Sequence, residues 1–198
     1  NSGVDGILII KYPSTGGAAT WTRVWGGVNG DSANAVVATS DGGILVVGSG
    51  QSYTTGWRAY ALKVTSAGAF SWNKSYGALG SGGLDAIQAS DGNYVIAGYT
   101  TISTKDALLV KTNTSGGIIW SRILDGAGDE QIESVAETAD GGYIISGWTG
   151  SYGAGGADAF ISKFDVNGNY LWTRVWGGAG DDNAKAVALH NDGSIAIS

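Results

Sequence analysis

Carboxylates and glycines gather in three short loops, whose side chains are the best suited in the chain to bind a cation. The loops read GGVNGD, DGAGDE and GGAGDD, at residues 26–31, 125–130 and 177–182. Calcium takes about six to eight oxygen ligands, which carboxylates and glycine carbonyls can supply. The corresponding loop GALGSG has no acid before Asp85, and the spacing is not that of a known calcium loop. We therefore interpret these loops as tight turns, and calcium is kept as the lesser alternative. Its ligands would be Asp129, Glu130, Asp181 and Asp182.

Catalytic constellations are missing from the sequence. The chain has a single histidine, His190, and no cysteine, which excludes disulfides, cysteine nucleophiles and thiolate metal sites. It has no G-x-S-x-G motif of the kind that holds a serine nucleophile. A catalytic pair of acids for glycoside hydrolysis should occur in one repeat and be absent from the others. Glu133 and Glu137 form such a pair. We interpret these two glutamates as exposed to solvent or as lying near the central axis of the fold. No cofactor is expected apart from the calcium alternative, and an enzyme is the least favoured class of function.

Aromatic side chains fall into a regular and an irregular group. The regular group occupies one equivalent position, at Trp21, Trp72, Trp120 and Trp172. An aromatic side chain buries roughly 150–250 Å², so its recurrence predicts packing between neighbouring units. The irregular group lies in or near loops, where exposure is expected, and its members are candidates for a glycan site or a protein interface. They are Tyr53, Trp57, Tyr99, Trp148 and Tyr152.

An internal repeat organises the whole chain. A phrase that opens with Asp-Gly occurs as DGGILVVGS, DGNYVIAGY, DGGYIISGW and DGSIAIS. The four copies begin at Asp41, Asp91, Asp140 and Asp192, so the steps are 50, 49 and 52 residues. The tryptophan marker recurs in the same order, as does a short apolar run that ends in lysine. These lysines are Lys11, Lys63, Lys111 and Lys163.

Each repeat has the pattern of four short strands. Asp-Gly followed by Gly, Asn or Ser between apolar runs is typical of a hairpin turn, because glycine tolerates a positive φ. No window has helical periodicity over three turns. Four strands in about 40–50 residues are typical of a β-propeller blade. The sequence therefore predicts an all-β fold: a single β-propeller domain over residues 1–198, built from four four-stranded blades.

The repeat also resembles a known family. Its consensus runs W-x-[RK]-x-[WYL]-G-G, an acidic glycine loop, D-G-G-Y-I-[IV]-x-G and D-A-x-x-x-K. This resembles the SBBP-type β-propeller repeats of secreted and cell-surface proteins of bacteria and archaea, and the resemblance covers the whole chain. It implies a propeller fold and an extracellular or cell-surface location. Members of that family usually carry more than four repeats.

The two ends of the chain carry complementary parts of one repeat. NSGVDGILIIK holds the third strand of a blade, and DGSIAIS holds the second. If the last residue were joined to the first, the step from Asp192 onward to Asp41 would be 47 residues, close to the steps between the other repeats. We therefore expect a circularly permuted closure, in which the N-terminal strands complete the C-terminal blade. In the alternative, residues 1–25 complete a blade of a neighbouring copy, giving a closed dimer or an open chain of subunits.

Composition and charge exclude several classes of protein. Eleven Lys and Arg residues stand singly against seventeen Asp and Glu, for a net charge of −6, so no nucleic-acid partner is expected. The apolar runs stop after four or five residues, so no membrane insertion is expected. Collagen is excluded because the 35 glycines have no three-residue period and proline occurs once.

These observations favour a non-enzymatic extracellular structural protein that self-associates into oligomers or filaments. Low charge, abundant glycine and aromatic residues, and the offset ends all agree with that hypothesis. The partner would then be a second copy of the chain. The alternative is a lectin-like propeller that binds a carbohydrate or another ligand through its irregular aromatic residues.

Overall fold

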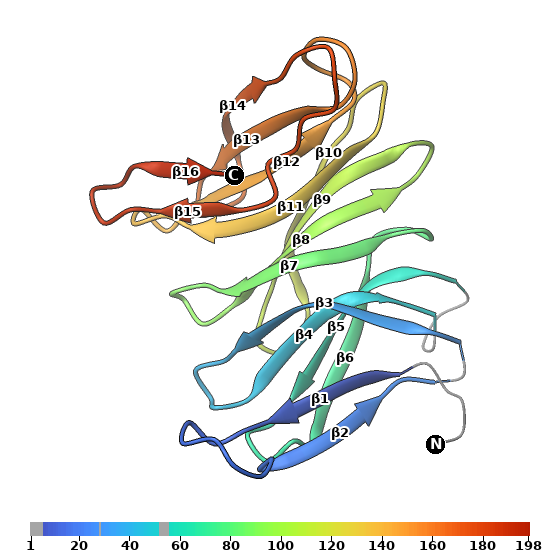
Figure 1. Ribbon diagram of the computed structural model, residues 1–198, viewed down its shortest axis with the longest axis vertical. Coiled ribbons are helices and arrows are strands. Elements are labelled where there is room, and N and C mark those ends of the chain that lie inside the picture. The colour runs from blue at the N-terminus through green and yellow to red at the C-terminus, as the bar shows by residue number, and fades with distance from the viewer. Residues whose placement is uncertain (1–5, 28, 52–55) are drawn as a thin grey trace.

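The computed structural model describes residues 6–27, 29–51 and 56–198, and within these ranges it contains strands and connecting segments but no helix (Figure 1). Three four-stranded antiparallel sheets make up most of the chain, and we call them blades. The first blade consists of β3 (Asp31–Ala38), β4 (Ile44–Gly50), β5 (Arg58–Val64) and β6 (Phe70–Tyr76). The second consists of β7 (Gly82–Gln88), β8 (Tyr94–Thr101), β9 (Lys105–Thr112) and β10 (Ile118–Leu124). The third consists of β11 (Glu130–Glu137), β12 (Tyr143–Thr149), β13 (Asp158–Phe164) and β14 (Tyr170–Trp176).

Two further hairpins flank the blades. The N-terminal half-blade pairs β1 (Ile7–Lys11) with β2 (Trp21–Trp25) and carries the sequence markers of the third and fourth strands of a repeat. The C-terminal half-blade pairs β15 (Val187–Leu189) with β16 (Ile195–Ile197) and carries those of the first and second strands. The all-β fold of repeated four-stranded sheets agrees with the sequence prediction.

The Asp-Gly turns set the register between the first two strands of each blade. In the third blade the Gly141 N–H donates to the Thr138 carbonyl at 2.8 Å, and Gly141 has a φ of +75°. The Asp140 carboxylate accepts the Gly142 N–H at 3.0 Å, which closes the turn. A β-branched or bulky residue would be strained at this φ, so the glycine is needed there.

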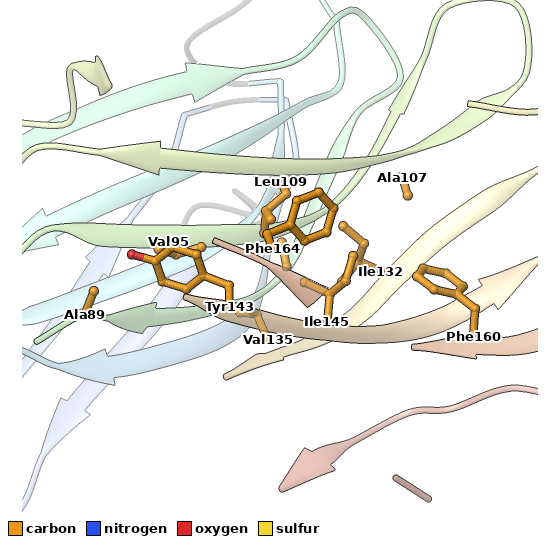
Figure 2. Close-up of a cluster of buried hydrophobic side chains, with 11 residues drawn as sticks. Ala89, Val95, Ala107, Leu109, Ile132, Val135, Tyr143, Ile145, Phe160 and Phe164 are labelled. Atoms are coloured by element: carbon orange, nitrogen blue, oxygen red, sulfur yellow. The ribbon is translucent and has the colours of Figure 1, made fainter. Parts of the chain in front are cut away.

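The blades stack side by side, with their first strands adjacent along the stack. Strand β3 contacts β7, β7 contacts β11, and β11 contacts β15 (Figure 1). The hydrophobic core lies between successive sheets, and Figure 2 shows the cluster between the second and third blades. There Val95 and Leu109 of the second blade meet Ile132, Tyr143 and Phe164 of the third, all of them buried. This arrangement is that of propeller blades.

The expected closure within one chain is not formed in this structure. The two half-blades lie at opposite ends of the stack, separated by three complete blades, and they belong to different sheets (Figure 1). The N-terminal strands therefore do not complete the C-terminal blade, and the described residues form an open arc in place of a four-bladed ring. The physical reason is curvature: the sequence specifies which strands pair, but the packing between neighbouring sheets sets the angle between them.

Candidate functional site: the two open ends of the stack

A buried lysine and the turn aspartate form an ion pair in every complete blade. Each lysine is the last of the apolar third-strand run, and its side chain is almost fully buried. The pairs are Lys63 with Asp41 at 2.9 Å, Lys111 with Asp91 at 2.6 Å, and Lys163 with Asp140 at 2.8 Å. Each pair joins the turn before the second strand to the third strand of the same blade, because the second and third strands are neighbours in the sheet.

These ion pairs change the ionisation of the aspartates. A hydrogen bond from the Lys63 ammonium, with others from the Thr39 hydroxyl and the Gly43 N–H, holds the pKa of Asp41 well below its usual range. Lys163, Thr138 and Gly142 lower the pKa of Asp140 in the same way. The carboxylates are thus kept charged beside the buried ammonium groups, which would otherwise lack a counter-charge.

The fourth lysine and the fourth aspartate of the repeat lie in different half-blades. Lys11 lies at the end of β1 and donates a hydrogen bond to the Ser66 carbonyl at 3.3 Å. Asp192 lies in the turn before β16 and accepts bonds from the Ser194 N–H and hydroxyl at 2.9 and 2.7 Å. Within the described ranges neither residue takes part in an ion pair. Sequence reasoning listed both residues as repeat markers but missed the pairing, although every repeat carries both.

Three fourth-strand tryptophans each pack onto a glycine turn of the next sheet. The turn joins the third and fourth strands there, and a Cβ atom on Gly68, Gly116 or Gly168 would lie only 2.7 to 2.9 Å from the indole carbons. The indoles concerned belong to Trp21, Trp72 and Trp120 respectively. Glycine at these turns therefore permits close contact between sheets, as expected for the regular tryptophans.

Arginine reinforces two of these contacts. Arg23 Nε donates to the Gly68 carbonyl at 3.0 Å, and Arg122 Nε donates to the Gly168 carbonyl at 2.5 Å. Arg174 has the same pose as Arg122: Nη1 donates to the preceding carbonyl, and the guanidinium lies over the tryptophan two residues before. Beyond Arg174 and Trp172 no further third-to-fourth-strand turn follows among the described residues.

Each end of the stack has an open cavity beside its half-blade. The cavity at the N-terminal end has a volume of about 290 Å³ and lies between β1 and the first blade, lined by residues 7–10, 33–36 and Val46. Leu8 is 59% exposed there and Val36 67% exposed. The cavity at the C-terminal end measures about 610 Å³, and its lining includes Lys163, Trp172 and Ile195.

The acidic glycine loops are tied to backbone N–H groups. Asp129 accepts the Lys105 N–H at 3.0 Å, and Asp181 accepts the Ala157 N–H at 2.9 Å. Asp182 accepts the Gly178 N–H at 2.9 Å, while Glu130 is buried and accepts the Thr149 hydroxyl at 2.9 Å. In the described part of the chain, no three His, Cys, Asp or Glu side chains are grouped as a metal site requires. One oxygen of each of these four carboxylates is therefore hydrogen-bonded within the protein, while the second oxygen of Glu130 is buried without a partner among the described residues.

Chelation is expected to leave the melting temperature unchanged. The four candidate carboxylates already accept hydrogen bonds from the protein, and a ligand that binds only the folded state would raise apparent stability. Differential scanning calorimetry with and without EDTA, followed by back-titration with calcium, measures this. A melting temperature that falls on chelation and returns with calcium would restore the calcium alternative.

The irregular aromatic residues do not form one site. The Lys105 ammonium lies over the rings of Tyr99 and Trp148, 4.8 Å from the first ring centroid and 5.4 Å from the second. Both rings are half-buried. Trp57 and Tyr152 are exposed and belong to different parts of the stack, and Tyr53 lies outside the described residues.

The two glutamates that break the repeat symmetry connect neighbouring sheets. Glu137 accepts bonds from the Ser90 N–H and hydroxyl, both at 2.7 Å. Glu133 accepts bonds from Gln131 and Asn183 at 2.9 and 3.2 Å and lies 3.8 Å from the Lys185 ammonium. Each carboxylate is therefore held by neighbouring polar groups of the protein.

Comparison with known proteins supports the fold and leaves the activity open. A protein of unknown function from Bacteroides caccae superposes with a TM-score of 0.61 at 18% identity, over 99% of this chain and 62% of that one. A Pseudomonas aeruginosa periplasmic gluconolactonase, PpgL, superposes with a TM-score of 0.48 at 12% identity, over 99% of this chain and 72% of that one. The second likeness is too weak to support an argument.

One curated sequence relative is also similar. The regulatory protein FlaEY of Caulobacter vibrioides is 25% identical over 126 residues, which is 57% of this chain and 13% of that protein. No family model matches the chain. No helix in the described ranges is long and apolar enough to cross a membrane. The chain is therefore similar in fold to a solved propeller-like protein of which it spans about three-fifths.

Proposed function

We propose that the chain is a non-enzymatic structural protein of the cell surface or extracellular space, which self-associates through the two ends of its stack. The observation that supports this proposal is the exposed apolar surface at the ends of the stack. Beside the N-terminal half-blade, Leu8 is 59% and Val36 67% exposed, and both line the open cavity there. The two half-blades lie at opposite ends of the stack (Figure 1).

The surfaces at these ends have the chemistry of an interface. Third strands β5, β9 and β13 of the complete blades are almost wholly buried on both faces, whereas β1 alternates buried and exposed side chains. Exposed apolar side chains beside an unpaired strand edge are typical of surfaces that other chains cover. The extracellular location rests on the resemblance of the repeat to SBBP-type propeller repeats.

Carbohydrate binding is the second candidate, and the exposure of Trp57 and Tyr152 favours it. Their side chains are 42% and 61% exposed, respectively. Exposed aromatic rings offer flat apolar surfaces for a sugar ring. However, the two residues are far apart in the sequence, and Lys105 already covers the faces of Tyr99 and Trp148.

Sedimentation velocity over a concentration series tests the first candidate, and a glycan array tests the second. We expect species that are multiples of the 20.1 kDa chain and whose population increases with concentration. A monomer at every concentration, together with specific binding on the array that Trp57→Ala or Tyr152→Ala abolishes, would favour the lectin-like function instead.

A further inference from the structure

We propose that a cavity between the second and third blades binds a primary ammonium group carried on an apolar chain. The cavity has an outer part of about 530 Å³ and an inner part of about 70 Å³. The two parts adjoin because they share lining residues: Leu124, Asp125, Tyr152, Thr173 and Val175. The inner part lies deeper, since its lining adds three buried residues: Glu130, Phe160 and Ser162. This site goes beyond the proposed self-association and does not depend on it, since its lining comes from the second and third blades.

The cavity lies where the fourth strand departs from the packing of its equivalents. The residue four positions after the regular tryptophan is aromatic in β2 and β6 and fills the space against the next sheet. Trp25 packs on Phe70 with ring centroids 5.6 Å apart. Tyr76 is buried, and its hydroxyl donates to the Gly116 carbonyl at 3.0 Å. In β10 this position holds Leu124, which has neither a ring nor a hydroxyl, so part of the equivalent space is left unfilled.

The third blade also places hydroxyl groups where the other blades are apolar. Directly before the buried lysine, β5 and β9 carry Leu62 and Val110, both buried. At the equivalent position β13 carries Ser162, whose hydroxyl is hydrogen-bonded to that of Thr173 at 2.5 Å. Thr173 is half-buried and lines both parts of the cavity. Since a hydroxyl oxygen has two lone pairs, Thr173 can accept a hydrogen bond from a molecule in the cavity.

The charged side chains of the inner part are acidic. Among the described residues, its lining contains Asp125 and Glu130 but no lysine, arginine or histidine. Glu130 is 3% exposed: its Oε1 accepts the Thr149 hydroxyl at 2.9 Å, while its Oε2 is buried without a partner in the described part of the chain. Neither carboxylate belongs to an ion pair within the described ranges. Because a buried carboxylate is costly without a counter-charge, the cavity favours a cation.

Arg122 lines the outer part but is bound elsewhere. Its Nε, Nη1 and Nη2 donate to the carbonyls of Gly168, Ser121 and Asn167 at 2.5, 2.8 and 3.0 Å, respectively. The guanidinium also lies over the Trp120 ring, 5.4 Å from its centroid. Arg122 is therefore held against the turn between β13 and β14, and it leaves the two carboxylates to a cation from outside the chain.

A primary ammonium on an apolar chain matches this lining. The ammonium has donors and no acceptor, and the exposed Asp125 carboxylate and the Thr173 hydroxyl offer acceptors, with the charge of Glu130 behind them. The ring of Tyr152 is 61% exposed and lines both parts, so it offers a face to the cation and to its apolar chain. A neutral sugar would leave the charge of Glu130 uncompensated. A free alkylamine and a lysine side chain of another protein share the chemistry that fits.

Titration of the full chain with n-butylammonium chloride at low salt tests the proposal. Isothermal titration calorimetry gives the affinity, and amide NMR signals locate the site. We expect the signals of residues 149–153 and of Thr173 to shift. Butan-1-ol has the same chain length without the charge and should bind at least roughly tenfold more weakly, because hydrogen bonds to charged groups are the stronger ones. Nα-acetyl-lysine methylamide is the probe for a lysine side chain, and glucose is the probe for a sugar.

Three variants change the cavity in different ways. Asp125→Asn removes an exposed charge and should weaken butylammonium binding roughly tenfold. Glu130→Gln should weaken it too, while the amide oxygen still accepts the Thr149 hydroxyl. Leu124→Tyr installs the residue that β6 carries at this position, so it should fill the cavity and abolish binding. Asp192→Asn is the control: it removes the same charge from an exposed turn of the C-terminal half-blade and should leave binding unchanged.

Each outcome bears on the proposal. Butan-1-ol binding as tightly as butylammonium, equal effects of Asp125→Asn and Asp192→Asn, or glucose binding in place of the amine would overturn it. Should Leu124→Tyr fail to fold, Asp125→Asn alone still decides, because its side chain is exposed. Binding of the blocked lysine as tightly as butylammonium would support a lysine side chain as the source of the ammonium, whereas binding of butylammonium alone would support a small free amine. Sedimentation of the same variants reports on self-association separately.

Discussion

Gly147→Ala is expected to lower the free energy of unfolding by about 3 kcal/mol or more, because nothing near this position can yield to a methyl group. A Cβ atom on Gly147 would lie 1.9 Å from the carbonyl oxygen of Gln131 in the neighbouring strand. The contact is with backbone, at the irregularity between Ile132 and Ser134 where the register of β11 and β12 shifts. Accommodating the methyl group therefore requires the two strands to separate.

Urea denaturation of Gly147→Ala measures the effect, with Gly178→Ala as the control. A Cβ atom on Gly178 would meet nothing within 4 Å, so that substitution should change the free energy of unfolding by less than about 0.5 kcal/mol. The equivalent glycines, Gly48 and Gly98, approach carbonyl oxygens at 1.8 and 2.0 Å and should behave like Gly147. Equal stability of Gly147→Ala and Gly178→Ala would contradict the described pairing of β11 with β12.

Deletion of residues 1–25 is expected to cause aggregation or loss of cooperative unfolding. The deletion removes Ile7, Ile9 and Trp21, which are buried against the first blade. Their removal uncovers the apolar side chains of that blade, among them Leu62 and Val64. Burying one such side chain contributes about 1.5–3 kcal/mol, so the loss of several contacts is large relative to the stability of a typical domain.

Calorimetry measures the unfolding transition of the deletion variant, and the binding of a hydrophobic dye measures its exposed apolar surface. Removal of residues 1–5 alone is the control, because it leaves β1 and β2 in place. We expect the long deletion to bind more dye and to lose its sharp transition. A soluble deletion variant with an unchanged transition would contradict the packing of the N-terminal half-blade. The closure expected from the sequence would make the C-terminal half-blade the partner of these strands, so that their deletion would uncover β16; the structure instead packs them against the first blade.

The sequence predicts which strands pair within a repeat, because turn residues and short apolar runs close together in the sequence determine that pairing. The turn at Asp140 and Gly141, the apolar strand after it and the run that ends at Lys163 recur in each repeat, and each has one compatible conformation. The regular tryptophans could likewise be assigned to packing between sheets, since Trp72 and Trp120 recur without variation.

The relation between sheets could not be predicted in the same way. Closure depends on the angle between blades, which arises from many contacts such as those between Leu109 and Phe164. No single residue specifies it, so the count of strands was compatible with a closed ring as well as with the open arc. The ion pairs of the third-strand lysines with the turn aspartates were found only in the structure, because the sequence does not show that these residues meet in space.

Electron microscopy of the purified chain tests most directly the central proposal that the chain self-associates. Two-dimensional class averages at increasing concentration would resolve the number of blades in each particle. We predict particles that contain several copies of the chain and that become more frequent as the concentration rises. Particles that are single chains at every concentration would contradict the claim.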